Sequence, residues 1–340
     1  MSDSPKGLDL TALSQYLEEH APDCLSGELS AAIVAGGKSN LTYAVTDGTR
    51  QVIVRRPPLG HVLSTAHDMV REHTVITALA PTDVPVPATY AVCADESVIG
   101  APFYVMQFVQ GTPYRDASQL EPLGVDRTRA IGHRLVDTLV ALHAVDYDAV
   151  GLGQFGRPEG FLERQVRRWR KQMTASSSRD LPGADELSDL LAARVPTGGD
   201  VSVLHGDYRL DNLLVTSDDG IGAVLDWEMA TLGDPLSDVA LFVVYQRLSQ
   251  LTPDSGVSDV ASAPGYPDTE AMLERYTRAS GRDVSHIGWH LGLAYYKLAT
   301  ILEGIHYRYI HGQTVGPGFE HVGTAVGPLV DAGLTALREG

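Results

Sequence analysis

Apolar and polar positions change their period about a third of the way along the chain. Residues 41–46 and 50–55 are rich in β-branched and aromatic side chains, and Asp47-Gly48-Thr49 separates them. An Asp-Gly turn between two such runs is typical of a hairpin, because its backbone needs the positive φ that these residues tolerate. A further run at 103–109 predicts another strand. The first third is therefore expected to be rich in β-structure.

Helical periodicity dominates the remainder. Two short strand-like runs, 213–215 and 222–225, flank a Ser-Asp-Asp-Gly turn within it. The segments with a helical pattern are 11–19, 66–79, 125–143, 160–173, 235–250, 268–280, 285–310 and 319–338. This order predicts an α+β chain with two lobes: a small β-rich N-lobe over residues 1–108 and a larger, mainly helical C-lobe over residues 109–340.

Glu72 breaks the apolar pattern of the helix at 66–79. Together with Ile76 and Leu79 it falls at positions i, i+4 and i+7, so all three side chains share one face. Burying a carboxylate without a partner is costly. We therefore expect a cationic side chain beside Glu72.

The strand at 50–55 should alternate its side chains between two faces. Val52 and Val54 point to one face, and Ile53 and Arg55 to the other. Arg56, which follows, falls on the face opposite Arg55 and is expected to be exposed to solvent.

Charge and composition narrow the possible functions. The 340 residues contain 26 Lys and Arg against 43 Asp and Glu, a net charge of −17. Such a surface repels phosphate backbones and anionic lipids, so nucleic-acid and membrane binding are not expected. A cationic substrate would be attracted, although an acidic surface more often serves solubility.

The two cysteines, Cys24 and Cys93, are far apart and form neither a disulfide framework nor a zinc motif, which fits a reducing compartment. The sequence shows no signal segment and no apolar run long enough to span a membrane. A cytoplasmic location is expected.

The most informative segment is His205-Gly206-Asp207-Tyr-Arg-Leu-Asp-Asn212, followed by Leu225-Asp226-Trp227. Phosphoryl transfer requires a carboxylate that orients and deprotonates the acceptor hydroxyl, and oxygen ligands that hold magnesium on the phosphates. An Asp at a strand end, an Asn five positions later and a second Asp after a short hairpin supply these groups. We expect Asp207 to be the catalytic base, with Asn212 and Asp226 binding Mg²⁺.

A purely structural role is the alternative, since Asp and Asn often cap turns. The agreement between the spacing, the flanking apolar strands and the second Asp argues against it. His205 is expected to brace the loop through a backbone hydrogen bond rather than to transfer a proton.

With its continuation into Gly233-Asp234-Pro235-Leu-Ser-Asp238, this segment resembles the aminoglycoside phosphotransferase and choline kinase superfamily. More narrowly, it is similar to the branch that occurs as kinase-like domains of some acyl-CoA dehydrogenase proteins. The resemblance covers roughly residues 28–310. It implies a protein-kinase-like bilobal fold with ATP bound between the lobes, and the same roles for Asp207, Asn212 and Asp226. Asp234 and Asp238 are expected to cap and brace the C-lobe.

The resemblance also assigns the nucleotide site. Gly36, Gly37 and Ser39 would lie in the loop over the phosphates, where glycine allows close backbone approach. Arg55 stands where the wider fold has a phosphate-binding Lys, and the two are not equivalent because Arg presents a planar fork. An Arg55–Glu72 pair would supply the partner that Glu72 requires.

The adenine ring would meet the backbone around Gln107–Val109, with Ile53 and Met106 as walls of the pocket. For both side chains ordinary packing is an equal alternative. The acceptor pocket would come from the helical lobe, where Trp169, Tyr295, Tyr296 and Arg308 are candidates.

Other classes fit the sequence less well. Gly37-Lys38-Ser39 would end a P-loop only if residue 32 were Gly, and it is Ala. Zinc-hydrolase and serine-hydrolase motifs are absent from the sequence, as are the His-Arg-Asp and Asp-Phe-Gly motifs of protein kinases. Two hypotheses therefore stand: an ATP- and Mg²⁺-dependent kinase of a small-molecule hydroxyl acceptor, and a degenerate kinase fold that binds a nucleotide or a partner without catalysis.

Overall fold

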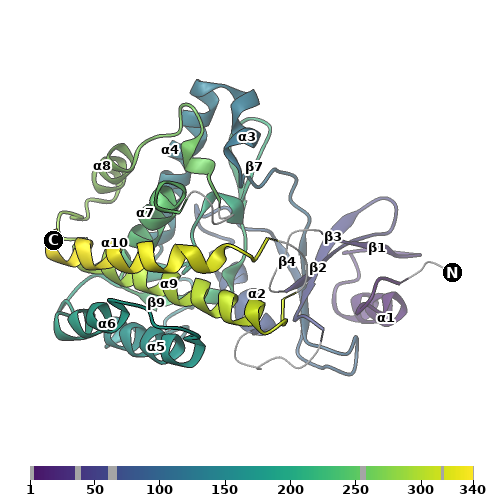
Figure 1. The fold of residues 1–340 in the computed structure, drawn as a ribbon. Helices are drawn as coiled ribbons and strands as arrows, with labels where there is room; N and C mark the ends of the chain where they lie inside the picture. Colours follow the sequence, from purple (N-terminus) through teal and green to yellow (C-terminus); the bar gives the residue numbers. More distant parts are fainter. Residues whose placement is uncertain (1–3, 35–39, 60–66, 253–257, 315–317, 340) are drawn as a thin grey trace.

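The hairpin around Asp47-Gly48 forms the middle of a five-stranded antiparallel sheet (Figure 1). The computed structural model describes residues 4–34, 40–59, 67–252, 258–314 and 318–339. Across the sheet the strands are β1 (Ser30–Ile33), β2 (Leu41–Thr46), β3 (Gln51–Arg56), β5 (Phe103–Gln107) and β4 (Thr89–Cys93). The predicted strand at 103–109 ends at Gln107, and β4 was not predicted.

The two faces of this sheet belong to different hydrophobic cores. Val52 and Val54 pack in a cluster with the apolar face of α1 (Leu10–His20). Ile53 belongs to the second cluster, which includes α2 (Met69–Leu79) and continues into the helical lobe. The predicted alternation along β3 is thereby confirmed, and it decides that Arg55 faces the helical lobe.

The expected exposure of Arg56 is wrong. Its side chain is buried, with 5% of its surface exposed, and its guanidinium donates hydrogen bonds to the carbonyls of Gly7 and Ile99, the latter at 3.1 Å. Two backbone carbonyls from distant segments satisfy the donors that burial removes from water. The β-period fixed the face of Arg56 correctly, but the N-terminal segment covers that face.

Eight helices follow the sheet among the described residues, and they form the larger lobe (Figure 1). They are α3 (Ala117–Leu120), α4 (Val125–His143), α5 (Phe161–Ser176), α6 (Ala184–Ala193), α7 (Leu236–Leu251), α8 (Thr269–Ser280), α9 (Gly288–Ile310) and α10 (Val326–Glu339). The predicted helix at 319–338 is shorter, because a 3-10 turn at Val322–Ala325 precedes α10. No helix in the described ranges combines the length and apolar character needed to cross a bilayer.

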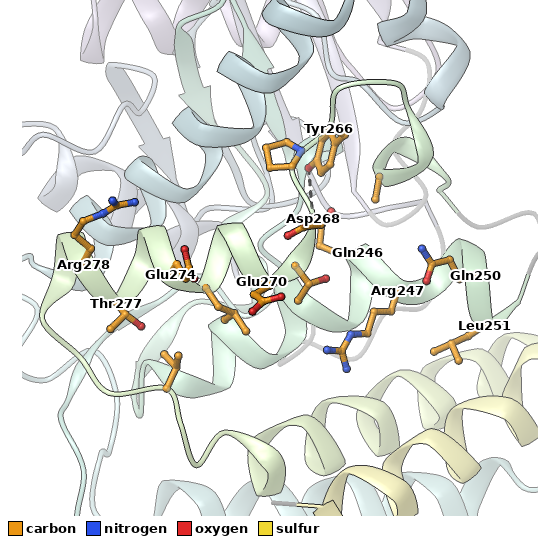
Figure 2. A pocket seen from close by; sticks show the side chains of 15 residues that line it. Gln246, Arg247, Gln250, Leu251, Tyr266, Asp268, Glu270, Glu274, Thr277 and Arg278 are labelled. Carbon is orange, nitrogen blue, oxygen red and sulfur yellow. Dashed lines mark hydrogen bonds between the residues drawn. The ribbon is translucent and has the colours of Figure 1, made fainter.

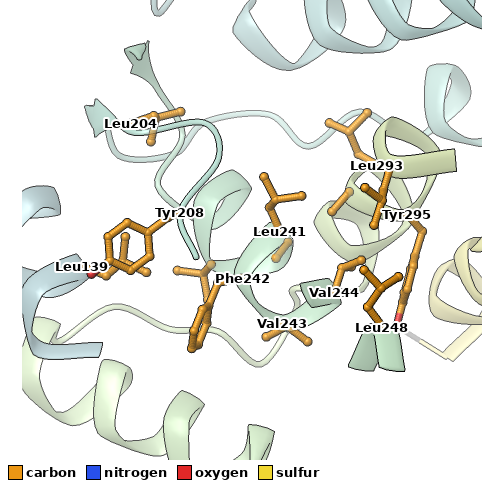
Figure 3. Close-up of a cluster of buried hydrophobic side chains, with 14 of the residues drawn as sticks. Leu139, Leu204, Tyr208, Leu241, Phe242, Val243, Val244, Leu248, Leu293 and Tyr295 are labelled. Atoms are coloured by element: carbon orange, nitrogen blue, oxygen red, sulfur yellow. The ribbon is translucent and has the colours of Figure 1, made fainter. Parts of the chain in front are cut away.

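Helix α7 is the centre of the helical lobe. Its side chains from Asp238 to Val244 are buried all round the helix, because the chain packs on several sides of it. Figure 3 shows Leu241 and Val244 of α7 lying between Tyr208 on one side and Leu293 of α9 on the other.

Two pairs of short antiparallel strands flank the segment predicted to be catalytic. Strand β6 (Ser202–Leu204) pairs with β9 (Thr231–Gly233), and β7 (Leu213–Val215) pairs with β8 (Ile221–Val224). The β7–β8 hairpin is nested in sequence between β6 and β9, so residues 205–212 lead from β6 into the hairpin and residues 225–230 lead from it to β9.

Truncating Leu241 tests the central role of α7. Leu241→Ala should lower the free energy of unfolding by about 2–5 kcal/mol, because the side chain is 2% exposed and leaves a cavity. Ile310→Ala, at a side chain that is 51% exposed, should change it by less than about 0.5 kcal/mol. Urea denaturation measures both, and equal losses would contradict the packing described.

Candidate functional site

Asp207 lies at the end of β6 with both carboxylate oxygens engaged. The side-chain amide of Asn212 donates to the Asp207 carbonyl at 2.8 Å and to its Oδ2 at 3.0 Å. The hydroxyl of Tyr245, from α7, donates to Oδ1 at 2.5 Å. A quarter of the Asp207 side-chain surface stays exposed. The carboxylate is therefore held in one orientation while remaining accessible.

The loop before Asp207 has a conformation that its sequence requires. Gly206 has φ of 81°, and a Cβ there would lie 2.7 Å from the Met229 carbonyl oxygen, so a side chain would clash. Buried Asp238 accepts the N–H groups of His205 and Gly206 at 2.7 and 2.9 Å. His205 lies 2.8 Å from the Leu225 carbonyl through Nε2, and its Nδ1 accepts the Asp207 N–H at 3.2 Å. These contacts agree with the bracing roles expected of His205 and Asp238.

Electrostatics keep Asp207 ionised. Burial by itself would raise the pKa of Asp207, but Arg209, the Tyr245 hydroxyl and Lys297 together hold that pKa below its ordinary value. The Nε of Arg209 lies 3.6 Å from Oδ2. A depressed pKa means that Asp207 is a weak base and that its contribution near neutral pH is orientation and charge.

Asp226 follows β8 in a strained conformation. Its φ of 66° and ψ of 61° are left-handed, and among the described residues only Asp219 shares a positive φ outside glycine. The N–H of the preceding Leu225 donates to the Asn212 carbonyl at 2.8 Å, which brings the two predicted metal ligands next to each other. Strain of this kind is common at functional positions.

Arg55 connects the lobes. Its Nε lies 3.0 Å from Oε2 of Glu72 on α2, and its Nη2 forms a short ion pair with Asp226. Glu72 also accepts from the Tyr104 hydroxyl at 3.0 Å and from the Asn40 amide at 3.1 Å. Glu72 thus has the cationic partner that was expected from its position on the apolar face of α2.

Burial and the neighbouring charges shift the pKa values of Glu72 and Arg55 in opposite directions. Burial raises the pKa of Glu72 to about 7, while Arg55 and the Tyr104 hydroxyl act in the lowering direction. The pKa of Arg55 is raised, since its acidic neighbours outweigh its desolvation. The guanidinium therefore stays charged, and its surroundings hold more carboxylates than it can fully neutralise.

The donor set fits a hard divalent cation. Asn212 uses Nδ2 on Asp207, which leaves its amide oxygen free, and Asp226 keeps Oδ2 free of the Arg55 ion pair. Magnesium usually takes one or two protein oxygens, with phosphate oxygens and water completing its shell. No group of three His, Cys, Asp or Glu suited to a metal occurs in the described part of the chain. The oxygens of Asn212 and Asp226 would suit magnesium that arrives with a nucleotide.

The remaining predicted residues are distributed as follows. Ile53 and Met106 are buried in the larger cluster. The Gln107 N–H donates to the Ala88 carbonyl at 2.7 Å, so this backbone donor of the predicted hinge is already used. Val109 is partly buried. Gly36, Gly37 and Ser39 lie outside the described residues. Asp234 accepts the Leu236 N–H at 2.9 Å and lies 3.0 Å from Nε2 of His290.

Sequence reasoning missed three side chains at this site. Tyr245 contacts Asp207 directly, Lys297 of α9 donates to the Gly206 carbonyl at 2.6 Å, and Asn40 bonds Glu72 and Glu228. Only Lys297 has a sequence signal, as the single formally charged residue between 288 and 302 of an otherwise apolar helix. A buried lysine needs a polar partner.

The acceptor candidates are mostly core residues. Trp169, Tyr295 and Tyr296 are 2–3% exposed in the larger cluster, while Arg308 is exposed. Packing explains the three aromatic side chains without an acceptor. Trp169 nevertheless adjoins the site, because the Lys297 ammonium lies 5.5 Å from its ring centroid.

The larger of two described pockets lies elsewhere. It has a volume of about 1000 Å³ between α7 and α8, and Figure 2 shows Arg247 and Gln250 of α7 facing Glu270 and Glu274 of α8. Its walls mix both signs of charge and contain none of the predicted site residues. Its size alone does not make it the functional site.

Comparison with known proteins agrees with this geometry. The phosphotransferase enzyme family model matches residues 30–306. A crystal structure titled "putative aminoglycoside phosphotransferase", from Ralstonia eutropha, superposes with a TM-score of 0.84 at 32% identity, covering 98% of this chain and 99% of that one. The aminoglycoside phosphotransferase APH(4)-Ia in complex with AMP-PNP and hygromycin B has a TM-score of 0.60 at 16% identity, covering 97% and 99% of the two chains, and shows the shared fold.

Among curated proteins, acyl-CoA dehydrogenase family member 11 of Rattus norvegicus is 34% identical over 97% of this chain and 43% of its own length. The probable acyl-CoA dehydrogenase IBR3 of Arabidopsis thaliana is 32% identical over 88% of this chain and 39% of its own length. The chain spans less than half the length of these relatives. The fold, the family match over most of the chain and the full-length structural relative establish that this protein belongs to the phosphotransferase enzyme family, with a kinase-like bilobal fold.

Proposed function

We propose that this protein transfers the γ-phosphoryl group of ATP to a hydroxyl of a small molecule, with Asp207 as the catalytic base. The observation that carries the proposal is the orientation of the Asp207 carboxylate beside Asn212 and next to the loop that holds Asp226. Phosphoryl transfer depends mainly on such positioning and on charge. The kinase-like fold and the nucleotide complexes of structural neighbours support it.

In the proposed step, the acceptor hydroxyl donates a hydrogen bond to the Asp207 carboxylate. As the oxygen forms a bond to the γ-phosphorus, the bond between that phosphorus and the β–γ bridging oxygen breaks, and ADP leaves. The hydroxyl proton passes to Asp207. Because the pKa of Asp207 is depressed, this transfer is expected late, when the oxygen has already lost electron density to phosphorus.

Asn212 and Asp226 would hold Mg²⁺, which when bound neutralises charge on the β- and γ-phosphate oxygens. Arg55 would direct its guanidinium to the phosphates while Glu72 fixes its position. Tyr104 and Asn40 donate hydrogen bonds to Glu72 in turn, so buried hydrogen bonds fix the position of the Glu72 carboxylate beside Arg55.

The preferred acceptor is an alcohol of the hydroxyacyl type. Relatives named as acyl-CoA dehydrogenase family members support this class. An aminoglycoside is the second candidate, supported by structural neighbours that are aminoglycoside phosphotransferases. The rival function, a nucleotide-binding module without catalysis, is favoured only if nucleotide binds and no acceptor is phosphorylated.

Asp207→Asn should abolish acceptor-dependent ADP release. We expect kcat to fall by about 10³-fold or more, because the amide cannot accept the proton, while affinity for ADP changes less than about twofold. The acceptor is first identified with the wild type, in a coupled ADP-release assay over a library of hydroxyl compounds. The variant is then measured with that acceptor.

Asp219→Asn is the matched control, since it makes the same change at the turn of the β7–β8 hairpin, where Asp219 pairs with Arg127. The kcat of Asp219→Asn should stay within about twofold of the wild-type value. Full activity of Asp207→Asn would contradict the assigned role, and silence of the wild type toward every acceptor would favour the binding module.

Arg55→Lys should weaken nucleotide binding by about tenfold, because one ammonium cannot reproduce a fork that reaches both Glu72 and Asp226. Arg50→Lys, in the exposed turn before β3, is the control and should have no effect. Titration with Mg²⁺ and AMP-PNP measures both, and unchanged affinity in Arg55→Lys would show that Arg55 does not meet the phosphates.

A further inference from the structure

A smaller pocket of about 530 Å³ lies where α2, the loop 154–157, the start of α5 and β9 meet. Three of the residues that line it are arginines, and none is acidic. The lining is Arg71, Gln154, Phe155, Gly156, Arg157, Phe161, Arg164, Gln165 and Thr231. A cluster of one sign is unexpected in a chain with a net charge of −17.

Two of the three guanidinium groups are held by contacts with uncharged partners, an aromatic ring and backbone carbonyls. Arg71 lies 3.7 Å from the centroid of the Phe155 ring and donates to the Ala230 carbonyl at 3.0 Å. Arg164 donates to the carbonyls of Glu159 and Arg157. Among the described residues, none of the three lining arginines forms an ion pair with a carboxylate. The positive charges of Arg71 and Arg164 are therefore held in place without a carboxylate in direct contact among the described residues.

Helix α5, which forms one wall, extends the positive charge. It carries Arg164, Arg167, Arg168, Arg170 and Lys171, with Glu163 as its acidic residue. Glu163 is exposed and does not line the pocket. Within the described ranges, Arg170 is the one basic residue of α5 with a partner carboxylate, Asp189 at 2.9 Å. Like charges this close repel each other unless an anion sits among them.

The pocket has a rigid frame. A Cβ on Gly156 would lie 2.7 Å from the Leu232 nitrogen, and one on Gly233 would lie 2.8 Å from the Phe161 ring. The loop and the start of α5 are therefore seated directly on β9. Such close packing keeps the walls of the pocket in position before any ligand arrives.

Contacts lead from this pocket to the candidate catalytic carboxylate. Thr231, a wall residue, pairs with Leu204, three residues before Asp207. Strand spacing and chain reach then place the Cα of Asp207 within roughly 16 Å of the Cα of Thr231. The carbonyl bound by Arg71 belongs to Ala230, and that of its neighbour Met229 packs on Gly206.

We propose that the Arg71–Arg157–Arg164 pocket binds an oxyanion, a phosphate or carboxylate group, within reach of the reacting centre. This inference rests on the proposed function in one respect: the natural source of the anion is a charged group on the acceptor, remote from its hydroxyl. Inorganic phosphate from solution is the other source. Planar guanidinium groups are suited to both anions because they donate paired hydrogen bonds.

The probe is inorganic phosphate, titrated calorimetrically into the full chain saturated with Mg²⁺ and AMP-PNP so that the nucleotide site is filled. Arg157→Glu should weaken binding by about tenfold or more, since Arg157 is exposed and its reversal puts a carboxylate into the pocket. Arg167→Glu makes the same charge change on α5 outside the lining, and should weaken it by less than about twofold. Absence of phosphate binding, or equal weakening in both variants, overturns the proposal.

The source of the anion follows from kinetics with the acceptor found by ADP release. If phosphate raises the KM for the acceptor and leaves kcat unchanged, the pocket holds a group of the acceptor. If phosphate changes kcat at saturating acceptor, the pocket responds to free phosphate. Asp207→Asn should bind phosphate as the wild type does. Phosphate binding by a wild type that phosphorylates no acceptor would reject the proposed function and leave this site standing.

Discussion

The ion triad of Arg55, Glu72 and Asp226 is the interaction on which the site depends. Its members come from β3, α2 and the loop after β8, so one guanidinium joins the two lobes. A buried cation requires partners, and removing one carboxylate would leave an uncompensated charge. The geometry explains why α2 keeps a carboxylate on its apolar face. Asp226, the partner of Arg55 from the C-lobe, has a left-handed backbone conformation.

Under the proposed function, the triad would also help the site to accept a highly charged nucleotide. Arg55 contacts two carboxylates. Burial, with Asp226 and Glu228 acting in the same direction, raises the pKa of Glu72 to about 7 although Arg55 lowers it. A magnesium ion on Asn212 and Asp226 would relieve that excess of negative charge, and the phosphates would provide a new partner for Arg55. Apposed groups on rigid elements need little rearrangement to reach this state.

Much of this arrangement was predictable because it follows from local rules. The Asp-Gly turn and the alternation in β3 gave the face of Arg55, and the helical period of α2 placed Glu72 where it needed a cation. The predictions that failed concern side chains whose burial or contacts are set by tertiary structure. Arg56 is buried because the N-terminal segment and the Ile99 carbonyl enclose it, and no local pattern announces that. Tyr245 reaches Asp207 from a helix 38 residues away, which short-range spacing cannot show.

Net charge does not by itself identify the acceptor. A value of −17 suggests attraction of cations, but it averages over the whole surface. The pocket beside α5 is lined by three arginines and no acidic residue. Local fields in a cleft, not the sum over the molecule, select the ligand.

A crystal structure of the chain with Mg²⁺ and AMP-PNP tests the account most directly. The account predicts the nucleotide between the lobes, with the Asn212 amide oxygen and the Asp226 carboxylate at roughly 2.1 Å from magnesium. It further predicts the Arg55 guanidinium on the phosphates and the Asp207 carboxylate facing the γ-phosphate from the acceptor side. A nucleotide bound outside the interlobe cleft, or a metal that contacts neither Asn212 nor Asp226, would contradict it.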